Sequence, residues 1–234
     1  MINVVIGIQA RSTSERLPGK ATEVICGVTI LDRVIDSCLA ASAKIAEKTR
    51  GSASVYVLTP KGDIIAEKYR ERVGIIEGSE HDVLSRYATL LGETTPSHIV
   101  RITGDCPLIP SSTIISLSLL AANYSYDYIS NVDERFRTSI DGVDCEVISA
   151  RLLRYAVEVA REGADKEHVT TLIRRRPPEW AKMATALNHF DQSHIKYSVD
   201  TPEDLATVRQ AFESAQVKYQ AAIRTYGKGR VHRI

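Results

Sequence analysis

The chain has 234 residues, of which 25% are charged, and its formal net charge is +1. This length fits one large domain, and the near-neutral charge is unlike the basic excess of proteins that bind DNA or RNA. The sequence contains no apolar run near the roughly 18 residues of a membrane span, and no recognisable signal peptide. We therefore expect a cytoplasmic protein that binds neither nucleic acid nor membranes.

Strand patterns alternate with helix patterns along most of the chain. A buried strand is predicted at 4–8, where four of five residues are β-branched. Further strands are predicted at 54–59, 73–77, 97–103, 126–131, 143–148, 182–188 and 196–199. Helices are predicted at 30–39, 64–72, 81–91, 114–123, 150–162, 166–175 and 202–214. This order predicts an α/β domain with a mainly parallel sheet over residues 1–215, followed by a tail at 216–234 that is mobile at 227–230.

The first strand leads directly into a polar loop with three cations, Arg11, Arg16 and Lys20. In open α/β sheets, ligands bind at the carboxyl edge of the strands, where such a loop lies. Cations on one short loop repel each other unless an anion lies among them, so we expect a polyphosphate there. A solvated basic loop is the alternative.

Two common nucleotide motifs are absent from this loop. A Walker A loop would need glycine at position 14 and Ser or Thr after Lys20, but the chain has Ser14 and Ala21. A Rossmann fingerprint would need two more glycines after Gly7. The loop is therefore cationic through side chains, which favours a triphosphate accompanied by a metal ion.

Two aspartates are candidates for holding that metal ion. Asp105 follows the strand predicted at 97–103, and Asp200 follows the one predicted at 196–199. One or two carboxylates with substrate oxygens and water form the usual Mg²⁺ site. The alternatives are a turn role for Asp105 before Pro107 and a helix N-cap role for Asp200 or Thr201.

The segments Gln9-Ala10-Arg11 and Arg16-Leu17-Pro18-Gly19-Lys20 resemble the nucleotide-binding signature of the cytidylyltransferases that activate acidic sugars. The resemblance is strongest to a branch typified by a spore coat polysaccharide synthesis protein. Further matches, in the expected order, lie at 82–87, 101–108, 141–147, 167–170 and 199–205.

This resemblance implies a Rossmann-like nucleotide-diphospho-sugar transferase fold and a Mg²⁺-dependent transfer of CMP from CTP to a small-molecule acceptor, with release of pyrophosphate. Arg11, Lys20 and Arg16 would be catalytic and hold the phosphates, and Asp105 and Asp200 would ligate the metal. The remaining nucleotide-binding residues would be Ile8, Gln9, Ala10, Asp82, Thr103 and Gly104. A helix ion pair between Asp82 and Arg86 is the alternative at that position.

The acceptor side is predicted from four residues. Asp144 and Glu146 are two apart on a predicted strand and so share a face, where they would orient the acceptor or act as a base. Glu167 and His168 would reach the same cleft. Solvated strand residues, and a capping or surface role, are the respective alternatives. The acceptor would be an acidic sugar or a phosphorylated or phosphonate compound.

Two other functions remain open from the sequence. A glycosyltransferase with a nucleotide-sugar donor would share the fold, although Asp141 and Asp144 do not make the usual D-x-D motif. A non-catalytic nucleotide-binding protein is the second alternative. The family resemblance also suggests a homodimer, built through residues 128–147. The four cysteines lack metal or disulfide spacing, which suits reduced thiols.

Overall fold

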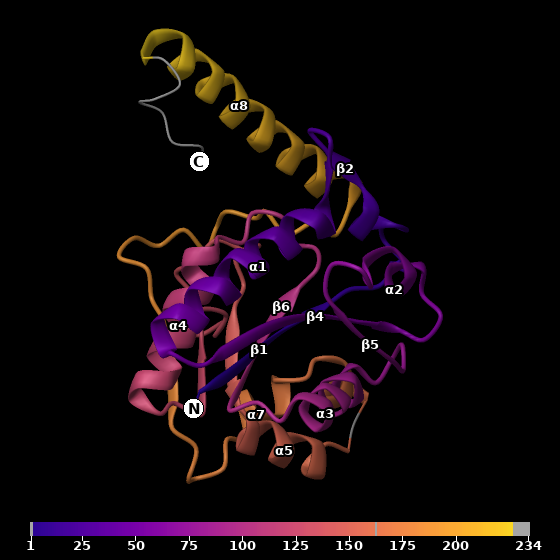
Figure 1. Cartoon of the computed structure of the whole chain (residues 1–234), viewed down its shortest axis with the longest axis vertical. Coiled ribbons are helices and arrows are strands. Elements are labelled where there is room, and N and C mark those ends of the chain that lie inside the picture. Colours follow the sequence, from indigo (N-terminus) through magenta and orange to yellow (C-terminus); the bar gives the residue numbers. More distant parts are fainter. Residues whose placement is uncertain (1, 162, 227–234) are drawn as a thin grey trace.

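A mixed sheet with helices on both faces forms the body of the protein (Figure 1). The computed structural model describes residues 2–161 and 163–226, and within them the main sheet has seven strands. Their spatial order is β5 (Gly74–Gly78), β4 (Ser52–Pro60), β1 (Asn3–Gln9), β6 (His98–Thr103), β8 (Glu146–Ser149), β7 (Tyr128–Ser130) and β9 (Met183–Thr185). Strand β8 is antiparallel to both neighbours, and every other neighbouring pair is parallel. The predicted mainly parallel α/β sheet is confirmed.

The strand order reverses at β1. From β1 the chain passes through α1 (Ile30–Thr49) to β4, and then through α2 (Ile64–Tyr69) to β5. It returns through α3 (Val83–Thr94) to β6, on the other side of β1. Crossovers in opposite directions leave a crevice outside the carboxyl ends of β1 and β6, the usual ligand position in open α/β sheets.

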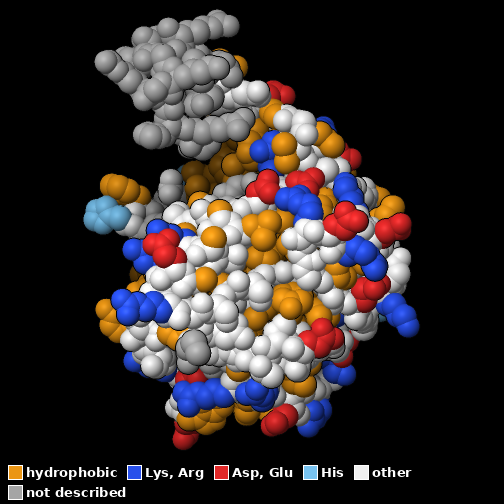
Figure 2. Space-filling model, in the orientation of Figure 1, with side chains coloured by type: hydrophobic (Ala, Val, Ile, Leu, Met, Phe, Trp, Pro, Cys, Tyr) orange, Lys and Arg blue, Asp and Glu red, His pale blue; other side chains and the backbone are white. Residues whose placement is uncertain are grey.

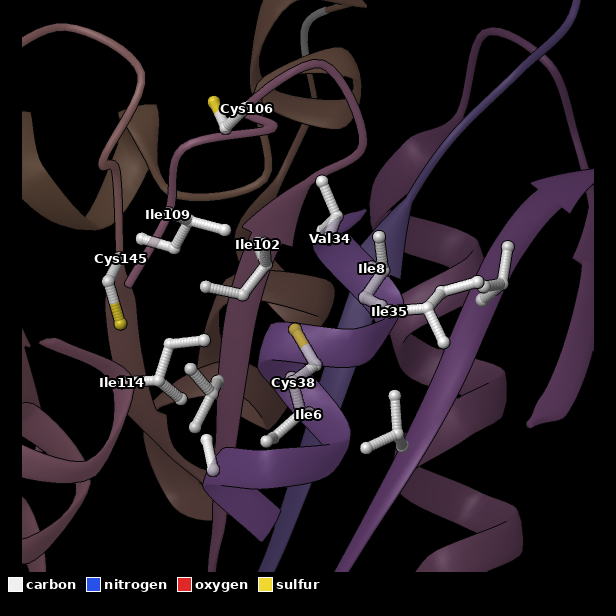
Figure 3. Packing of buried hydrophobic residues seen from close by; sticks show 14 of the residues in the cluster. Ile6, Ile8, Val34, Ile35, Cys38, Ile102, Cys106, Ile109, Ile114 and Cys145 are labelled. Atoms are coloured by element: carbon white, nitrogen blue, oxygen red, sulfur yellow. The ribbon is translucent and has the colours of Figure 1, made fainter. Parts of the chain in front are cut away.

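An apolar core fills each face of the sheet, because side chains alternate between faces along a strand. Ile6 of β1 packs with Cys38 of α1 and with Ile114 of α4 (Ser111–Tyr124) in the first core (Figure 3). Val5 belongs to the second core, which includes residues from α3, α5 (Ala150–Val159) and α7 (Thr171–Arg175). Both cores hold β1 and β6 firmly, so the loops at their carboxyl ends start from fixed positions.

A short helix and a small hairpin follow the first loop and are not among the predicted elements. They are η1 (Lys20–Thr22) and the antiparallel pair β2 (Val24–Ile25) and β3 (Val28–Thr29). Strands of two residues are too short to show an alternating pattern. Ile25 packs with Leu205 and Val208 of the last helix, α8 (Pro202–Tyr226), so the hairpin connects the first loop to that helix.

Helix α8 (Pro202–Tyr226) begins at the predicted residue but is much longer than the predicted 202–214. The proposed division between residues 215 and 216 therefore falls inside a helix. Its second half projects away from the sheet (Figure 1). The segment expected to be mobile, 227–230, lies outside the described residues.

Two further predictions differ from the structure. The helix predicted at 166–175 is two helices, α6 (Gly163–Glu167) and α7, because Val169 between them has a φ of 56° and cannot continue a helix. Residues 196–199 make no strand. Instead, the amide of Tyr197 donates to the carbonyl of Asp141 at 2.5 Å. This segment therefore pairs with the loop at Asp141 and is not part of the main sheet.

Charged side chains of both signs are interspersed on the face shown in Figure 2, in keeping with the net charge of +1. In the part of the chain that the structure describes, the helices are too short or too polar to cross a membrane.

Candidate functional site

A pocket of about 460 Å³ lies outside the carboxyl ends of β1 and β6, at the reversal of strand order. Gln9 and Thr103, which are partners in the sheet register, form part of its wall together with Ala10 and Gly104. A Cβ atom on Gly104 would lie 2.9 Å from the Cβ of Ala10, so glycine is needed where the two loops leave the sheet side by side. These four predicted nucleotide-binding residues are therefore brought together.

The cationic loop is closed by backbone hydrogen bonds. The amide of Gly19 donates to the carbonyl of Ser12 at 2.9 Å, and the amide of Ser12 donates to a carboxylate oxygen of Asp63 at 2.8 Å. Gly19 has a φ of 72°, which turns the chain into η1. Lys20 is the first residue of η1, and the closed loop thus places it in the lining of the pocket.

Lys20 lies between the two predicted metal ligands. Its Nζ is 2.6 Å from Oδ2 of Asp105 and 3.1 Å from Oδ1 of Asp200, and its side chain is only 15% exposed. Burial disfavours the charged ammonium, but the ion pairs with both carboxylates outweigh burial and raise the pKa of Lys20. Residues 20, 105 and 200, far apart in sequence, thus meet at one ammonium group.

Asp200 is not the N-cap of α8. The cap is Thr201, whose Oγ1 accepts from the amide of Asp204 at 3.2 Å, and Asp204 in turn accepts from the amides of Asp200 and Thr201. The carboxylate of Asp200 is left to face cations: Lys20, Arg16 at 3.0 Å and Lys196 at 3.3 Å. Burial alone would raise the pKa of Asp200, but these cations lower it.

Backbone hydrogen bonds on either side of Asp105 fix its position. The amide of Gly104 donates to the carbonyl of Gln9 at 2.9 Å, and the carbonyl of Asp105 accepts from the amide of Val199 at 2.9 Å. The same hydrogen bond fixes the segment that leads to Asp200. The two carboxylates are therefore positioned by one continuous set of backbone contacts.

These two carboxylates fit a divalent cation. Both approach one ammonium nitrogen within 3.1 Å, so a cation in that position would have two hard oxygen donors, with phosphate oxygens and water to complete the shell. Groups of three or more His, Cys, Asp and Glu side chains with metal-binding geometry do not occur among the described residues. A metal here would take its remaining ligands from a substrate or from water.

The two arginines of the loop have different partners. Arg16 is 66% exposed and pairs with Asp200, whereas Nη1 of Arg11 lies 3.7 Å from Oε1 of Glu80. Glu80 also accepts a hydrogen bond from Thr13. Arg11, Arg16 and Lys20 all line the pocket, as the sequence predicted.

Two predicted nucleotide-binding residues do not line the pocket. The side chain of Ile8 is fully buried in the core, and its backbone pairs with strands on both sides. Asp82 is the N-cap of α3, where Oδ1 accepts from the amide of Ser85 at 2.9 Å, and this role also replaces the alternative ion pair with Arg86. A short polar side chain before a helix favours this capping geometry.

Arg86 does line the pocket, although it is only 3% exposed. Its Nη1 donates to the carbonyl of Leu58 at 2.9 Å, while the buried Nε has no partner among the described residues. The helical spacing could have revealed this burial, because Arg86 is three residues after Val83 and four before Leu90, both of which are buried. Glu80, by contrast, shows no sequence signal.

The predicted acceptor residues divide into two pairs. Glu167 and His168 line the pocket, as expected. Glu146 is 1% exposed and is held by Arg101 at 2.7 Å, by the hydroxyl of Tyr128 at 2.7 Å and by Thr170 at 2.9 Å. Burial alone would raise its pKa, but the charge of Arg101 and the hydrogen bonds from Tyr128 and Arg101 lower it. A direct contact of Glu146 with an acceptor does not fit this burial.

Asp144 also lies outside the pocket lining. It precedes β8, which begins at Glu146, so the two carboxylates do not share a strand face as predicted. Its Oδ1 lies 2.5 Å from a guanidinium nitrogen of Arg137, and burial raises the pKa of Asp144 to about 6. The two carboxylates therefore do not form the predicted pair on one strand face.

An α/β sheet whose switch point holds cations and two convergent carboxylates has the features expected of the nucleotide-binding α/β class. The cytidylyltransferase family matches residues 4–228, and the chain belongs to that family. It is therefore a nucleotidyltransferase with the Rossmann-like fold of this class.

Individual relatives agree with this assignment. The chain is 26% identical over 226 residues to the spore coat polysaccharide biosynthesis protein SpsF of Bacillus subtilis strain 168, covering 92% of this chain and 88% of that protein. A cytidylyltransferase structure from Leptospira borgpetersenii has a TM-score of 0.79 at 28% identity, covering 89% of this chain and 86% of that one. A CMP:2-keto-3-deoxy-manno-octonic acid synthetase complexed with CTP has a TM-score of 0.66 at 15% identity, covering 91% and 99% of the two chains, and shares the fold.

Proposed function

We propose that this enzyme transfers CMP from CTP to an acidic sugar or to a phosphorylated or phosphonate small molecule, and that it requires Mg²⁺. The observation that carries the proposal is the position of Lys20 between Asp105 and Asp200 in a pocket that Arg11 and Arg16 also line. A fold neighbour was solved with CTP, and SpsF is named for spore coat polysaccharide biosynthesis, which favours an acceptor used for surface polysaccharides or glycoconjugates.

The charge of the pocket supports the requirement for a metal. Its lining contains four permanent cations and five carboxylates: Arg11, Arg16, Lys20 and Arg86 against Glu15, Glu80, Asp105, Glu167 and Asp200. A triphosphate brings several further negative charges, and the side chains alone cannot balance them. A divalent ion held by Asp105 and Asp200 would supply the missing positive charge and polarise the phosphates.

In this reaction an oxygen of the acceptor forms a bond to the α-phosphorus, and the bond from that phosphorus to the bridging oxygen breaks. Lys20, Arg11 and Arg16 bind the β- and γ-phosphates and stabilise the charge that develops on pyrophosphate. Gln9 and Ala10 meet the base at the end of β1, beside Thr103 and Gly104. Where the attacking group is a hydroxyl, Glu167 and His168 are the pocket residues available to accept its proton.

Pyrophosphate release from CTP, measured with a panel of keto sugar acids, sugar phosphates and phosphonates, tests the proposal. Mass spectrometry of the products identifies the CMP conjugate. Lys20→Ala and Asp105→Ala should lower kcat by about 100- to 1000-fold, the effect of removing one preorganised charge-stabilising group. The control is Lys44→Ala, which removes an exposed lysine paired with Glu47 on α1. Unchanged rates in both pocket variants, or turnover without CTP, would overturn the proposal.

We further propose a homodimer and a cytoplasmic location. The dimer is supported by exposed apolar side chains in and near the predicted segment: Phe136 is 56% exposed, Leu187 is 60% exposed and Phe190 is 74% exposed. Support for the cytoplasm is that the four cysteines are free. Light scattering of the purified protein tests the first, and a fluorescent fusion tests the second.

A further inference from the structure

A second pocket, of about 380 Å³, lies at the same edge of the sheet. It is formed by the start of α4, the end of β7, the loop at 138–143 and the residues that follow β9. The loop that begins at Asp105 leads to Pro110, the N-cap of α4, so this loop separates the two pockets. The lining residues of one pocket do not recur in the other.

The second pocket is uncharged. Asp, Glu, Lys, Arg and His are missing from its lining among the described residues, whereas nine charged residues line the first pocket. Its polar members are hydroxyl and amide side chains: Ser112, Thr113, Ser116, Asn131, Ser139 and Asn188. Leu117, Ile140 and Val143 supply aliphatic surface between them. This mixture disfavours ions, because a charged ligand would lose water without gaining a counter-charge.

Several of these hydroxyl groups have unused hydrogen-bonding capacity. Those of Ser112, Thr113, Ser116 and Ser139 make no hydrogen bond to other described residues. Ser139 lines the pocket although only 2% of the residue is exposed. Ser118 on the same helix is different, because its hydroxyl donates to the carbonyl of Ile114 at 2.7 Å.

The walls around these hydroxyls are fixed. The amide of Asn131 donates to the carbonyl of Val143 at 2.8 Å and its oxygen accepts from the amide of Cys145 at 2.8 Å, which ties the loop to the end of β7. Pro110, the N-cap of α4, makes no side-chain cap hydrogen bond, and in the first turn the amide of Thr113 donates to the carbonyl of Pro110 at 3.1 Å. The pocket thus offers several fixed donors and acceptors without charge.

We propose that this second pocket binds a neutral polyhydroxyl group, such as a neutral glycose or alditol unit. Such a ligand has many hydroxyls that both donate and accept, as serine and threonine do, and C–H surfaces that pack on aliphatic side chains. The volume is within the range of about 300–1000 Å³ usual for small-ligand sites. The proposal does not depend on CMP transfer and holds for the protein with or without nucleotide.

Backbone amide NMR of the full chain tests this proposal with ribitol, glucose and mannose as neutral probes, and with glucuronate and glucose 1-phosphate as charged probes. We expect at least one neutral probe to cause saturable shifts at Ser112, Thr113 and Ser139, with weaker or no effect from the charged probes. Absence of saturable shifts with every neutral probe, or tighter binding of the charged probes, would overturn it.

Matched variants separate hydrogen bonding from shape. Thr113→Val keeps the volume but loses the hydroxyl, and should weaken neutral-probe binding about fivefold, the effect of one neutral hydrogen bond. Thr113→Ser restores the hydroxyl and should bind. Ser118→Ala makes a comparable change outside the pocket and should have no effect on the probes. Lys20→Ala should weaken CTP binding and leave the probes unaffected. Equal binding by Thr113→Val and the wild type would contradict the inference.

Discussion

Replacing Lys20 by methionine should leave the space between Asp105 and Asp200 open to a metal cation, because the ammonium group that lies there is removed. The ammonium contacts Asp105 at 2.6 Å and Asp200 at 3.1 Å. At an effective dielectric constant of about 20, each contact corresponds to a Coulomb energy on the order of 5 kcal/mol, much of which desolvation cancels. Lys20→Met leaves two carboxylates facing each other, and we expect it to lower the free energy of unfolding by about 3 kcal/mol.

A divalent cation should reverse this loss. At 100 times its Kd, Mn²⁺ or Mg²⁺ stabilises a folded protein by about 2.7 kcal/mol, and each kcal/mol shifts Tm by about 2–4 °C in a chain of this size. Thermal unfolding without nucleotide should therefore show a metal-dependent rise of about 5–10 °C in Lys20→Met. The rise should be much smaller in the wild type, where the ammonium competes. Lys44→Met, which removes an exposed lysine, serves as the control.

Equal metal-dependent shifts in the wild type and in Lys20→Met would refute this reasoning, because they would show that the metal does not compete with the ammonium. So would the absence of a shift in the variant. Asp105→Asn in the Lys20→Met background should abolish the shift, which identifies the carboxylates as the ligands.

Three other substitutions give sharp expectations. Glu146→Gln should cost about 3–5 kcal/mol of unfolding free energy by leaving Arg101 buried without its counter-charge. The pKa of Glu146 in the folded protein is lowered from 4.5, so its contribution to the free energy of unfolding is complete above about pH 4.5 and is lost as the pH falls through the folded pKa. Urea unfolding at a series of pH values should therefore show a smaller loss of stability with acid in the variant than in the wild type. Gly142→Ala should lower the free energy of unfolding far more than Gly62→Ala, as measured by urea titration. Gly142 has a φ of 110° and an added Cβ would lie 2.5 Å from neighbouring backbone atoms, whereas Gly62 has a φ of 76° and open space around it. Equal losses of stability in the two variants would contradict this. Arg86→Lys should weaken CTP binding about tenfold by calorimetry, since lysine cannot reproduce the guanidinium contacts, and an unchanged Kd would exclude a role in binding.

Local patterns were enough to predict the centre of the site. Strand β1 is apolar and β-branched, so its end and the loop that carries Lys20 follow from sequence alone. Asp105 directly follows a strand, and parallel strands place their carboxyl ends at one edge. Asp200 was found even though its predicted strand was wrong, because a hydrogen bond from Val199 to Asp105 brings this segment to the same place.

The predicted placements that differ from the structure depend mostly on contacts between distant segments. Glu146 pairs in register with Arg101 across β6 and β8, 45 residues away in sequence, and alternation along one strand cannot reveal that partner. Asp144 likewise lies before the strand that was expected to contain it. Capping of α3 by Asp82 is a local feature, but it competes with a nucleotide-binding role that the family motif suggested for the same residue.

The geometry of the site implies an order of events for Lys20. Without nucleotide, its ammonium neutralises the two carboxylates that would otherwise repel each other. A triphosphate would offer Lys20 a stronger set of oxygen partners, and Asp105 and Asp200 would then be the residues available to hold a divalent ion. Nucleotide and metal should therefore bind cooperatively, because each removes the electrostatic penalty that the other would meet alone.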